Sequence, residues 1–358
     1  MLRNLGFLFL AVSLTLFFSF GCGDDNSPVG GNTPDSATVA ARLDASLHGS
    51  TNGMAWWYSS SNGGFEKFTN LSYDDLACRD CHVTGADCRT CHPDDGNGGF
   101  GKPVADSCYK CHGRQKAEAA VHPDVHMTQY GLTCADCHSS EDIHPATAAP
   151  NSVYNGAVKT NCQQSGCHTD PATIHGTNAI YNQHKDDFYC AACHTNNTIS
   201  CINCHFENEV LNGKKIANNQ AHGWKLLIKY QKAGDPAPKV YPGTIMTMTY
   251  HDSAFYAIGP YYGHAITIPT SCSDCHNSPA NQMYNDSGYI RLLTWNKNTR
   301  KLEPIDGVVP IPDDWQTALK IDFATMDSNG VWIYQQDSCS QNGTEMHFAQ
   351  PVGRIPKF

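Results

Sequence analysis

Apolar and polar positions divide the chain into three stretches of different pattern. The first contains an apolar run at residues 5–20, LGFLFLAVSLTLFFSF, after Arg3 and just before Gly21. A positive charge, an apolar run and a small residue in this order predict a secretory signal over residues 1–21. The residues that follow are mostly Gly, Asn, Ser, Pro and Asp, which bury little surface, so we expect a flexible tether over residues 22–46.

The middle stretch, residues 47–276, shows no long helical periodicity. Gly, Asn and Pro are scattered through most of it, which predicts short helical turns and loops. Clearer patterns begin only near its end. HGWKLLIKYQK at 222–232 predicts a short amphipathic helix, and KVYPGTIMTMTYHDSAFYAI at 239–258 is rich in the Tyr, Thr, Ile and Val that favour strands.

The third stretch, residues 277–358, has the pattern of a small β-rich unit. YIRLLTWNKNTRKLEPIDGVVPI predicts a strand, an NKNT turn and a second strand. In PDDWQTALKI, Asp313 or Asp314 stands where it could cap a short helix. We expect this region to be a structural lid or a docking surface.

Cysteine and histidine content changes this picture, because the chain has eighteen of each. Sixteen cysteines form eight close pairs, and the residue after the second Cys of every pair is His. The cysteines are Cys78, Cys81, Cys88, Cys91, Cys108, Cys111, Cys134, Cys137, Cys162, Cys167, Cys190, Cys193, Cys201, Cys204, Cys272 and Cys275. The histidines that follow the pairs are His82, His92, His112, His138, His168, His194, His205 and His276.

A His after every cysteine pair points to one kind of cofactor. Zinc ribbons and plain disulfides are the alternatives, but neither requires that His. C-x-x-C-H is the attachment signature of c-type haem, in which two thioether bonds hold the porphyrin and the imidazole binds the iron. We therefore expect eight covalently attached haems c.

The pair Cys162–Cys167 departs from the common spacing, because four residues, QQSG, separate its cysteines. A disulfide is the alternative here, since an exported protein can form one. A wider loop can bulge while both sulfurs still reach the porphyrin and His168 keeps its place. We expect haem at this site as well.

The density of these motifs predicts the fold class. Residues 78–205 carry seven of them, about 18 residues per haem, which is too little chain for an ordinary apolar core. We expect a mostly irregular, haem-cored multihaem cytochrome c domain with short helices over residues 47–276, followed by a small β-containing C-terminal region.

The second face of each iron decides between electron carrier and enzyme, since an open position binds small molecules. Ten histidines lie outside the motifs, enough to cap eight irons, and all are candidate distal ligands: His48, His122, His126, His144, His175, His184, His222, His251, His264 and His347. Met127, Met246, Met248 and Met346 are weaker candidates, whose more common use is packing. We expect the clusters Trp56–Tyr58 and Tyr261–Tyr262 to cover porphyrin faces and edges.

Cys22 suggests how the exported chain is held. The SFGC junction resembles a bacterial lipoprotein cleavage site, although Ser19 stands where that pattern prefers Leu. We expect lipid on Cys22 and an outer-membrane or cell-surface protein, with the periplasm as second choice. Retention of the apolar run as a membrane anchor is the alternative. We expect Cys339 to be an unpaired thiol, with an intermolecular disulfide as the other reading.

The net negative charge of the chain disfavours anionic binding partners. The formal net charge is −10 at pH 7, and ferric bis-His haems with ionised propionates make it more negative. Nucleic acid and anionic membrane surfaces are therefore poor partners. Other redox proteins with positive patches, or metal-oxide surfaces, are better ones.

From Cys78 to His276, the motif type and density resemble the outer-surface multihaem c-type cytochromes of metal-reducing bacteria. The resemblance implies stacked bis-His haems that pass respiratory electrons outward, and in some relatives filaments. The ten histidines outside the motifs exceed eight irons by two, so a ligand could be donated to a neighbouring subunit, and His48 and His347 are the expected donors because they lie nearest the chain ends. The main alternative is an octahaem oxidoreductase acting on small nitrogen or sulfur compounds at one open haem. Such families sometimes use CxxCK, which is absent here. A periplasmic electron store is a third possibility. We expect an electron carrier without catalytic residues.

Overall fold

The computed structural model describes residues 36–76, 87–147, 151–202, 220–251, 253–267, 271–327, 329–335 and 340–358. Several predictions concern residues outside these ranges: the secretory signal, Cys22, the motif at 78–82, Cys204, His205 and Cys339. Within the described ranges, no helix combines the length and the apolar character needed to cross a membrane.

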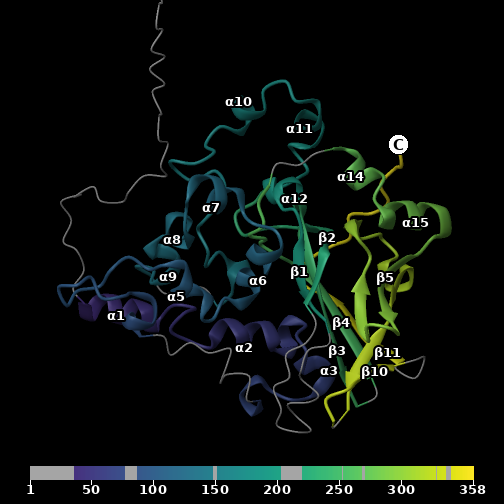
Figure 1. Cartoon of the computed structure of the whole chain (residues 1–358), viewed down its shortest axis with the longest axis horizontal. Coiled ribbons are helices and arrows are strands. Elements are labelled where there is room, and N and C mark those ends of the chain that lie inside the picture. The colour runs from purple at the N-terminus through teal and green to yellow at the C-terminus, as the bar shows by residue number, and fades with distance from the viewer. Residues whose placement is uncertain are drawn as a thin grey trace, which may run out of the picture.

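The described chain forms two regions that lie side by side (Figure 1). We call residues 36–194 the helical region and residues 198–358 the sheet region. The helical region contains most of the cysteine motifs, and the sheet region contains all of the strands listed below. The part of the expected tether that is described begins with an exposed helix, α1.

The helices of the helical region are short, at most nine residues each. Capping residues fix both ends of such a short helix. At α7 the Asp124 carboxylate accepts hydrogen bonds from the first backbone amides, and Gly131 ends the helix at a φ of 68°. The helices are α1 (Ser36–Asp44), α2 (Asn52–Tyr58), α3 (Glu66–Thr69), α4 (Cys88–Cys91), α5 (Ala105–Tyr109), α6 (Gly113–Val121), α7 (Val125–Tyr130), α8 (Cys134–Cys137), α9 (Ser140–Ile143), α10 (Pro171–His175), α11 (Ala179–His184) and α12 (Cys190–His194), with 3-10 turns η1 (Ser60–Asn62), η2 (Tyr73–Asp75) and η4 (Val153–Asn155).

The sheet region is built on one six-stranded sheet of order β11-β4-β3-β1-β2-β7, together with a three-stranded sheet, β6-β5-β8, and a pair, β10-β9. Its strands are β1 (Thr198–Cys201), β2 (Gln220–Tyr230), β3 (Lys239–Tyr250), β4 (Ser253–Pro260), β5 (Ile290–Asn296), β6 (Lys301–Pro304), β7 (Gly307–Pro310), β8 (Leu319–Ile321), β9 (Phe323–Met326), β10 (Trp332–Gln335) and β11 (Ser340–Met346). Its helices are α14 (Ser273–His276), α15 (Pro279–Ser287) and α16 (Trp315–Ala318).

The amphipathic helix predicted at 222–232 is wrong, because these residues belong to strand β2. The strand pairs with β3 on one side, antiparallel, and with β7 on the other, parallel. Leu226, Leu227 and Ile228 are all buried, so both faces of this strand are covered. A short apolar run buried on both faces has no period of two, and it cannot be told from a buried helix by pattern alone.

The strands predicted elsewhere are confirmed, except that the second strand predicted after the NKNT turn is two strands, β6 and β7, which belong to different sheets. Residues 239–258 fall in β3 and β4, which form an antiparallel hairpin, and the NKNT turn joins β5 to β6. Helix α16 begins after Asp314, as predicted, but the Asp314 carboxylate makes no capping hydrogen bond. It accepts a 2.7 Å hydrogen bond from the Tyr284 hydroxyl instead.

Strands from both sides of the expected 276/277 boundary share the main sheet. β7 pairs with β2, and β11 pairs with β4, so the C-terminal residues complete a sheet that earlier residues begin. The main apolar core lies in this sheet region and includes Trp224, Ile245 and Ile258, each without exposed surface.

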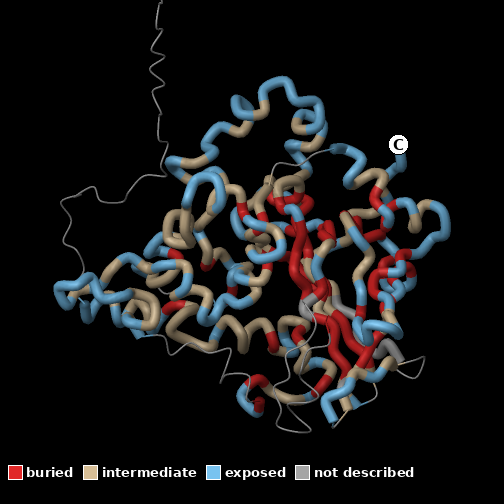
Figure 2. Tube along the Cα trace, viewed as in Figure 1, coloured by how far each residue is buried: buried red, intermediate tan, exposed pale blue. Residues whose placement is uncertain are grey.

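Burial differs sharply between the two regions (Figure 2). Buried residues follow the strands of the sheet region, whereas the helical region is mainly exposed or half-buried. Between residues 87 and 190, apart from 148–150, the one buried apolar residue is Ala157. The other buried residues there are Glu118, Asp124, Asp142 and Ser152, all polar. The protein part of this segment therefore has no apolar core of its own.

Candidate cofactor-binding site: a row of cysteine motifs and facing histidines

Each described motif closes into a tight turn that brings its His back over its first Cys. In four C-x-x-C-H motifs the His amide donates to the carbonyl of that Cys, at 2.8 Å for Cys88, 2.9 Å for Cys108, 2.8 Å for Cys134 and 3.1 Å for Cys272. The motif at 190–194 forms helix α12. One turn of helix places both sulfurs and the imidazole on the same side, as a single attached group requires.

The wide motif closes in the same way. The His168 amide donates to the Cys162 carbonyl at 3.1 Å, despite the two extra residues. Gly166 absorbs the extra length with a φ of 83°, a conformation that residues with a side chain rarely adopt. The Cys162 sulfur lies 3.8 Å from the Tyr189 hydroxyl and is not in a disulfide.

Five motif histidines each face one histidine from outside the motifs. The distances between ring centres are 6.1 Å for His48–His112, 6.0 Å for His126–His168, 6.2 Å for His138–His264, 6.0 Å for His175–His194 and 6.4 Å for His184–His276. Every pair combines one expected proximal ligand with one expected distal candidate.

The separation in these pairs suits a metal ion between the rings. An imidazole nitrogen binds a first-row metal ion at about 2 Å, so two imidazoles on opposite sides of one ion have ring centres roughly 6.3 Å apart. The five measured distances lie within a few tenths of an ångström of this value. The donor set and its spacing therefore fit an iron with two imidazole ligands.

Five of the ten paired histidines, and also His92, hold Nδ1 in a hydrogen bond that leaves the other ring nitrogen available. Nδ1 bonds to a backbone carbonyl in four cases and to a carboxylate in two, and in each case Nε2 remains for a metal. The bonds join His92 to Gly101 (2.9 Å), His175 to Pro171 (2.8 Å), His194 to Thr267 (3.0 Å), His276 to Pro356 (2.8 Å), His126 to Asp124 (3.1 Å) and His138 to Asp142 (3.1 Å). Metal-binding histidines usually donate their second nitrogen in this way.

Burial keeps several of the facing imidazoles neutral. It lowers the pKa of His48 to about 4 and that of His264 to about 4, with smaller contributions from neighbouring histidines. Burial also lowers the pKa of His112 and of His194. Only a neutral imidazole can bind a metal, so these residues are prepared as ligands at neutral pH.

The motifs lie next to one another in chain order. Near the start of the row, the Lys110 ammonium donates to the Thr90 carbonyl at 3.2 Å, which joins motif 108–112 to motif 88–92. Burial and the neighbouring Cys134 thiol raise the pKa of Cys108 to about 11, so motif 134–138 adjoins motif 108–112.

The same continuity holds through the centre of the row. The Cys137 carbonyl accepts hydrogen bonds from the Thr160 hydroxyl at 2.8 Å and from the Gln164 amide at 3.3 Å, which ties motif 134–138 to motif 162–168. A hydrogen bond with the Cys190 thiol lowers the pKa of Cys162, so motif 190–194 comes next.

The last step crosses into the sheet region. Lys225, on β2, donates to the carbonyls of Thr195 at 2.6 Å and Cys193 at 3.5 Å, and its charge also acts on Cys275. The six described motifs thus form one unbranched row, in the order 88–92, 108–112, 134–138, 162–168, 190–194 and 272–276. We call this the motif row.

The remaining histidines have other surroundings. The edge of His92 meets Phe100 at 6.0 Å, and His122 lies near His222. His144 lies near His48, and His251 stacks on Tyr250 with ring centres 4.0 Å apart. The proximal candidates His82 and His205 fall outside the described residues, and geometry assigns no ligand role to His122, His144, His222 or His251.

His347 and the aromatic clusters pack against other protein groups. The His347 ring is 3% exposed and packs edge-on against Trp57 at 4.0 Å. Trp56 stacks on Phe348, and the Tyr261 hydroxyl donates to Glu118 at 3.0 Å. In the described residues these side chains contact protein groups, and their expected role on porphyrin faces stays a prediction.

Sequence reasoning missed three charged residues that border the motif row: Asp124, Asp142 and Lys225. Asp142 follows His138 by four residues, and Asp124 precedes His126 by two, so local spacing is a signal that could have found both. Lys225 had no such signal, because it was assigned to a helix and its neighbours in space are distant in sequence.

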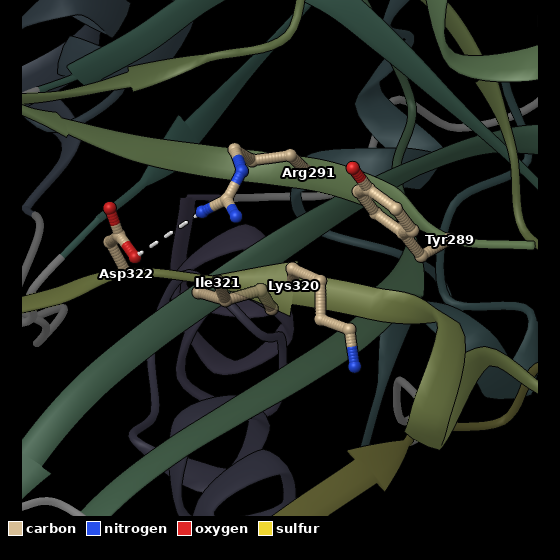
Figure 3. Close-up of a pocket in the computed structure, with 5 residues that line it drawn as sticks. All are labelled: Tyr289, Arg291, Lys320, Ile321 and Asp322. Carbon is tan, nitrogen blue, oxygen red and sulfur yellow. Dashed lines mark ion pairs between the residues drawn. The ribbon is translucent and has the colours of Figure 1, made fainter. Parts of the chain in front are cut away.

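A shallow hollow on the sheet region is separate from the motif row (Figure 3). It is lined by Tyr289, Arg291, Lys320, Ile321 and Asp322, and Arg291 pairs with Asp322 at 4.0 Å. It contains neither His nor Cys. In the described part of the chain, no group of three or more His, Cys, Asp or Glu side chains is arranged to hold a metal ion on its own.

Comparisons of this chain with protein-family models, with curated proteins and with solved structures give no match.

Proposed function

We propose that this chain is a multihaem c-type cytochrome that carries electrons along eight closely packed haems, each with two histidine ligands. The observation that supports this most strongly is the set of five facing histidine pairs, each formed by one motif His and one other His at 6.0–6.4 Å. The continuous motif row supplies the path.

The cysteines and histidines of each site have separate roles in this proposal. Haem, when bound, supplies one-electron exchange at its iron. The two cysteines would hold the porphyrin through thioether bonds, and the motif His and the facing His would both bind its iron. Because the second face is closed, a substrate would have to displace an imidazole, which favours electron transfer over catalysis.

The burial pattern supports large apolar groups bound along residues 87–190. Residues 87–190 bury one apolar side chain in the described part, while Val104, Tyr130 and Ile174 are half or more exposed. A chain with this pattern cannot offset the conformational entropy lost on folding by burying its own surface. Porphyrins wedged between the facing histidines would supply the missing apolar contacts.

Localisation and partners follow from the same proposal. Haem c attachment takes place outside the cytoplasm, which agrees with the secretory signal expected at 1–21 and a lipid on Cys22. We propose an outer-membrane or cell-surface lipoprotein that exchanges electrons with redox proteins or metal oxides. Replacing Cys22 by Ser should release the protein from the membrane fraction, whereas an unprocessed protein that stays there would point to a membrane anchor instead.

The alternative, an octahaem oxidoreductase with one open iron, is favoured by one feature. Among the described motif histidines, His92 is the one for which no facing His is recorded; its ring meets Phe100 instead. If the second face of that iron is open, small molecules could bind there.

One measurement tests the number of haems, and a second decides between the carrier and the enzyme. Intact mass should exceed that of the processed polypeptide by eight haem masses, and a gain of seven would indicate a Cys162–Cys167 disulfide. The electron paramagnetic resonance spectrum of the oxidised protein should be low-spin throughout, with negligible carbon monoxide binding after reduction. One high-spin ferric iron that binds one carbon monoxide would instead establish the oxidoreductase.

A further inference from the structure

Two buried carboxylates bond directly to histidines of the motif row. Asp142 holds Nδ1 of His138 at 3.1 Å and also accepts hydrogen bonds from the Thr160 hydroxyl and the Lys159 amide. Asp124 holds Nδ1 of His126 at 3.1 Å. Asp142 and Asp124 are 9% and 7% exposed, so their charges are poorly screened by water.

These two carboxylates act on the two central sites of the row. His138 belongs to motif 134–138, and His126 faces His168 of motif 162–168. A carboxylate on Nδ1 makes an imidazole a stronger donor to iron and favours the ferric form, which carries one more positive charge. At the neighbouring sites His194 and His276 bond to neutral backbone carbonyls, which have a weaker effect.

A buried lysine lies at the next step of the row. Lys225 is 5% exposed and stands between motifs 190–194 and 272–276, where its ammonium donates to two backbone carbonyls. Burial lowers the pKa of Lys225, and the nearby negative charge of Asp274 acts in the opposite direction by favouring the charged ammonium. A positive charge held in a poorly screened site disfavours the ferric form of both adjacent irons.

We propose that the motif row contains a built-in step in reduction potential, which rests on the haem-carrying function proposed above. Asp142 and Asp124 lower the potentials at motifs 134–138 and 162–168, and Lys225 raises those at motifs 190–194 and 272–276. Electrons that enter the centre of the row therefore settle on its C-terminal end. Cys272 is exposed there, so this end is accessible to an acceptor.

Three substitutions test the step: Asp142→Asn, Asp124→Asn and Lys225→Met. Asn keeps the shape of Asp and removes its charge. Each Asn variant should shift the lowest-potential part of a spectroscopic redox titration upward, and Lys225→Met should shift the highest-potential part downward. Lys225→Arg keeps the charge and should titrate like the parent protein.

Lys229→Met is a matched control, because Lys229 lies on the same strand four residues away and is exposed. It should leave the titration unchanged. Haem content and the low-spin signal, measured on the same samples, report on the proposed function separately. A variant with full haem content and an unshifted titration would overturn the role of the residue replaced. A parent protein without covalent haem would overturn the proposed function itself. If Lys225→Met loses haem, the two Asn variants still decide whether the central sites are lowered.

Discussion

The helical region and the sheet region differ in what fills their interiors. In the sheet region, Trp224, Leu226 and Ile258 meet in a core with no exposed surface, as in an ordinary protein. In the described residues between 87 and 190 the buried groups are mostly polar, and histidine rings stand about 6 Å apart. Apolar side chains thus form the interior of the sheet region, and we expect porphyrins to form the interior of the helical region.

The largest difference between the two regions should appear when haem attachment is prevented, for example by making the chain in a compartment without the attachment machinery. Residues 87–190 should then fail to fold, because their side chains bury almost no apolar surface. Strands β2, β3 and β4 should keep slow amide exchange, since their core needs no cofactor. Hydrogen exchange read by mass spectrometry distinguishes the two segments, and slow exchange across 87–190 in haem-free protein would contradict the haem-cored fold.

A substitution in the core of the sheet region should lower the stability of that region and leave the haem sites unchanged. Leu226 is fully buried, so Leu226→Ala should lower the free energy of unfolding by about 2–5 kcal/mol, through lost transfer energy and a cavity. Haem absorbance and spin state should not change. Ile333→Ala, on an exposed side chain of β10, should change stability by less than about 0.5 kcal/mol. Denaturant unfolding followed by far-ultraviolet circular dichroism measures both variants.

The two regions also differ in what sequence could predict. The cysteine pairs and their histidines stand out because attachment chemistry dictates local spacing, and the hairpin of β3 and β4 has clear strand composition. Which His faces which motif has no local signal, since His138 and His264 lie far apart along the chain. β2 was assigned to a helix because strands buried on both faces lose the alternation that marks a strand.

Opening a single site should produce a change of one iron among eight. His264→Ala removes the ring that faces His138 at 6.2 Å, so that iron should become high-spin and bind one equivalent of carbon monoxide after reduction. His347→Ala is the control, because in the described residues the His347 ring packs against Trp56, Trp57 and Phe348 and faces no motif histidine. A carbon monoxide site in the His347 variant, with none in the His264 variant, would reverse the two assignments.

The smallest effect that we expect concerns the bulge of the wide motif. Gly166 has a φ of 83°, so Gly166→Ala should cost about 1–2 kcal/mol of local strain. Because the strain falls on the loop between Cys162 and Cys167, part of the purified protein should carry one haem fewer, visible as a second species in the intact mass. Gly288→Ala introduces a comparable strain at a φ of 74°, at the end of α15 in the sheet region, where a Cβ meets no neighbour within 4 Å. Its cost should appear in the stability of the sheet region alone, with haem content unchanged. Full haem content in both variants would mean that thioether formation at the wide motif tolerates a bulge of a different shape, and that Gly166 eases folding without being required for attachment.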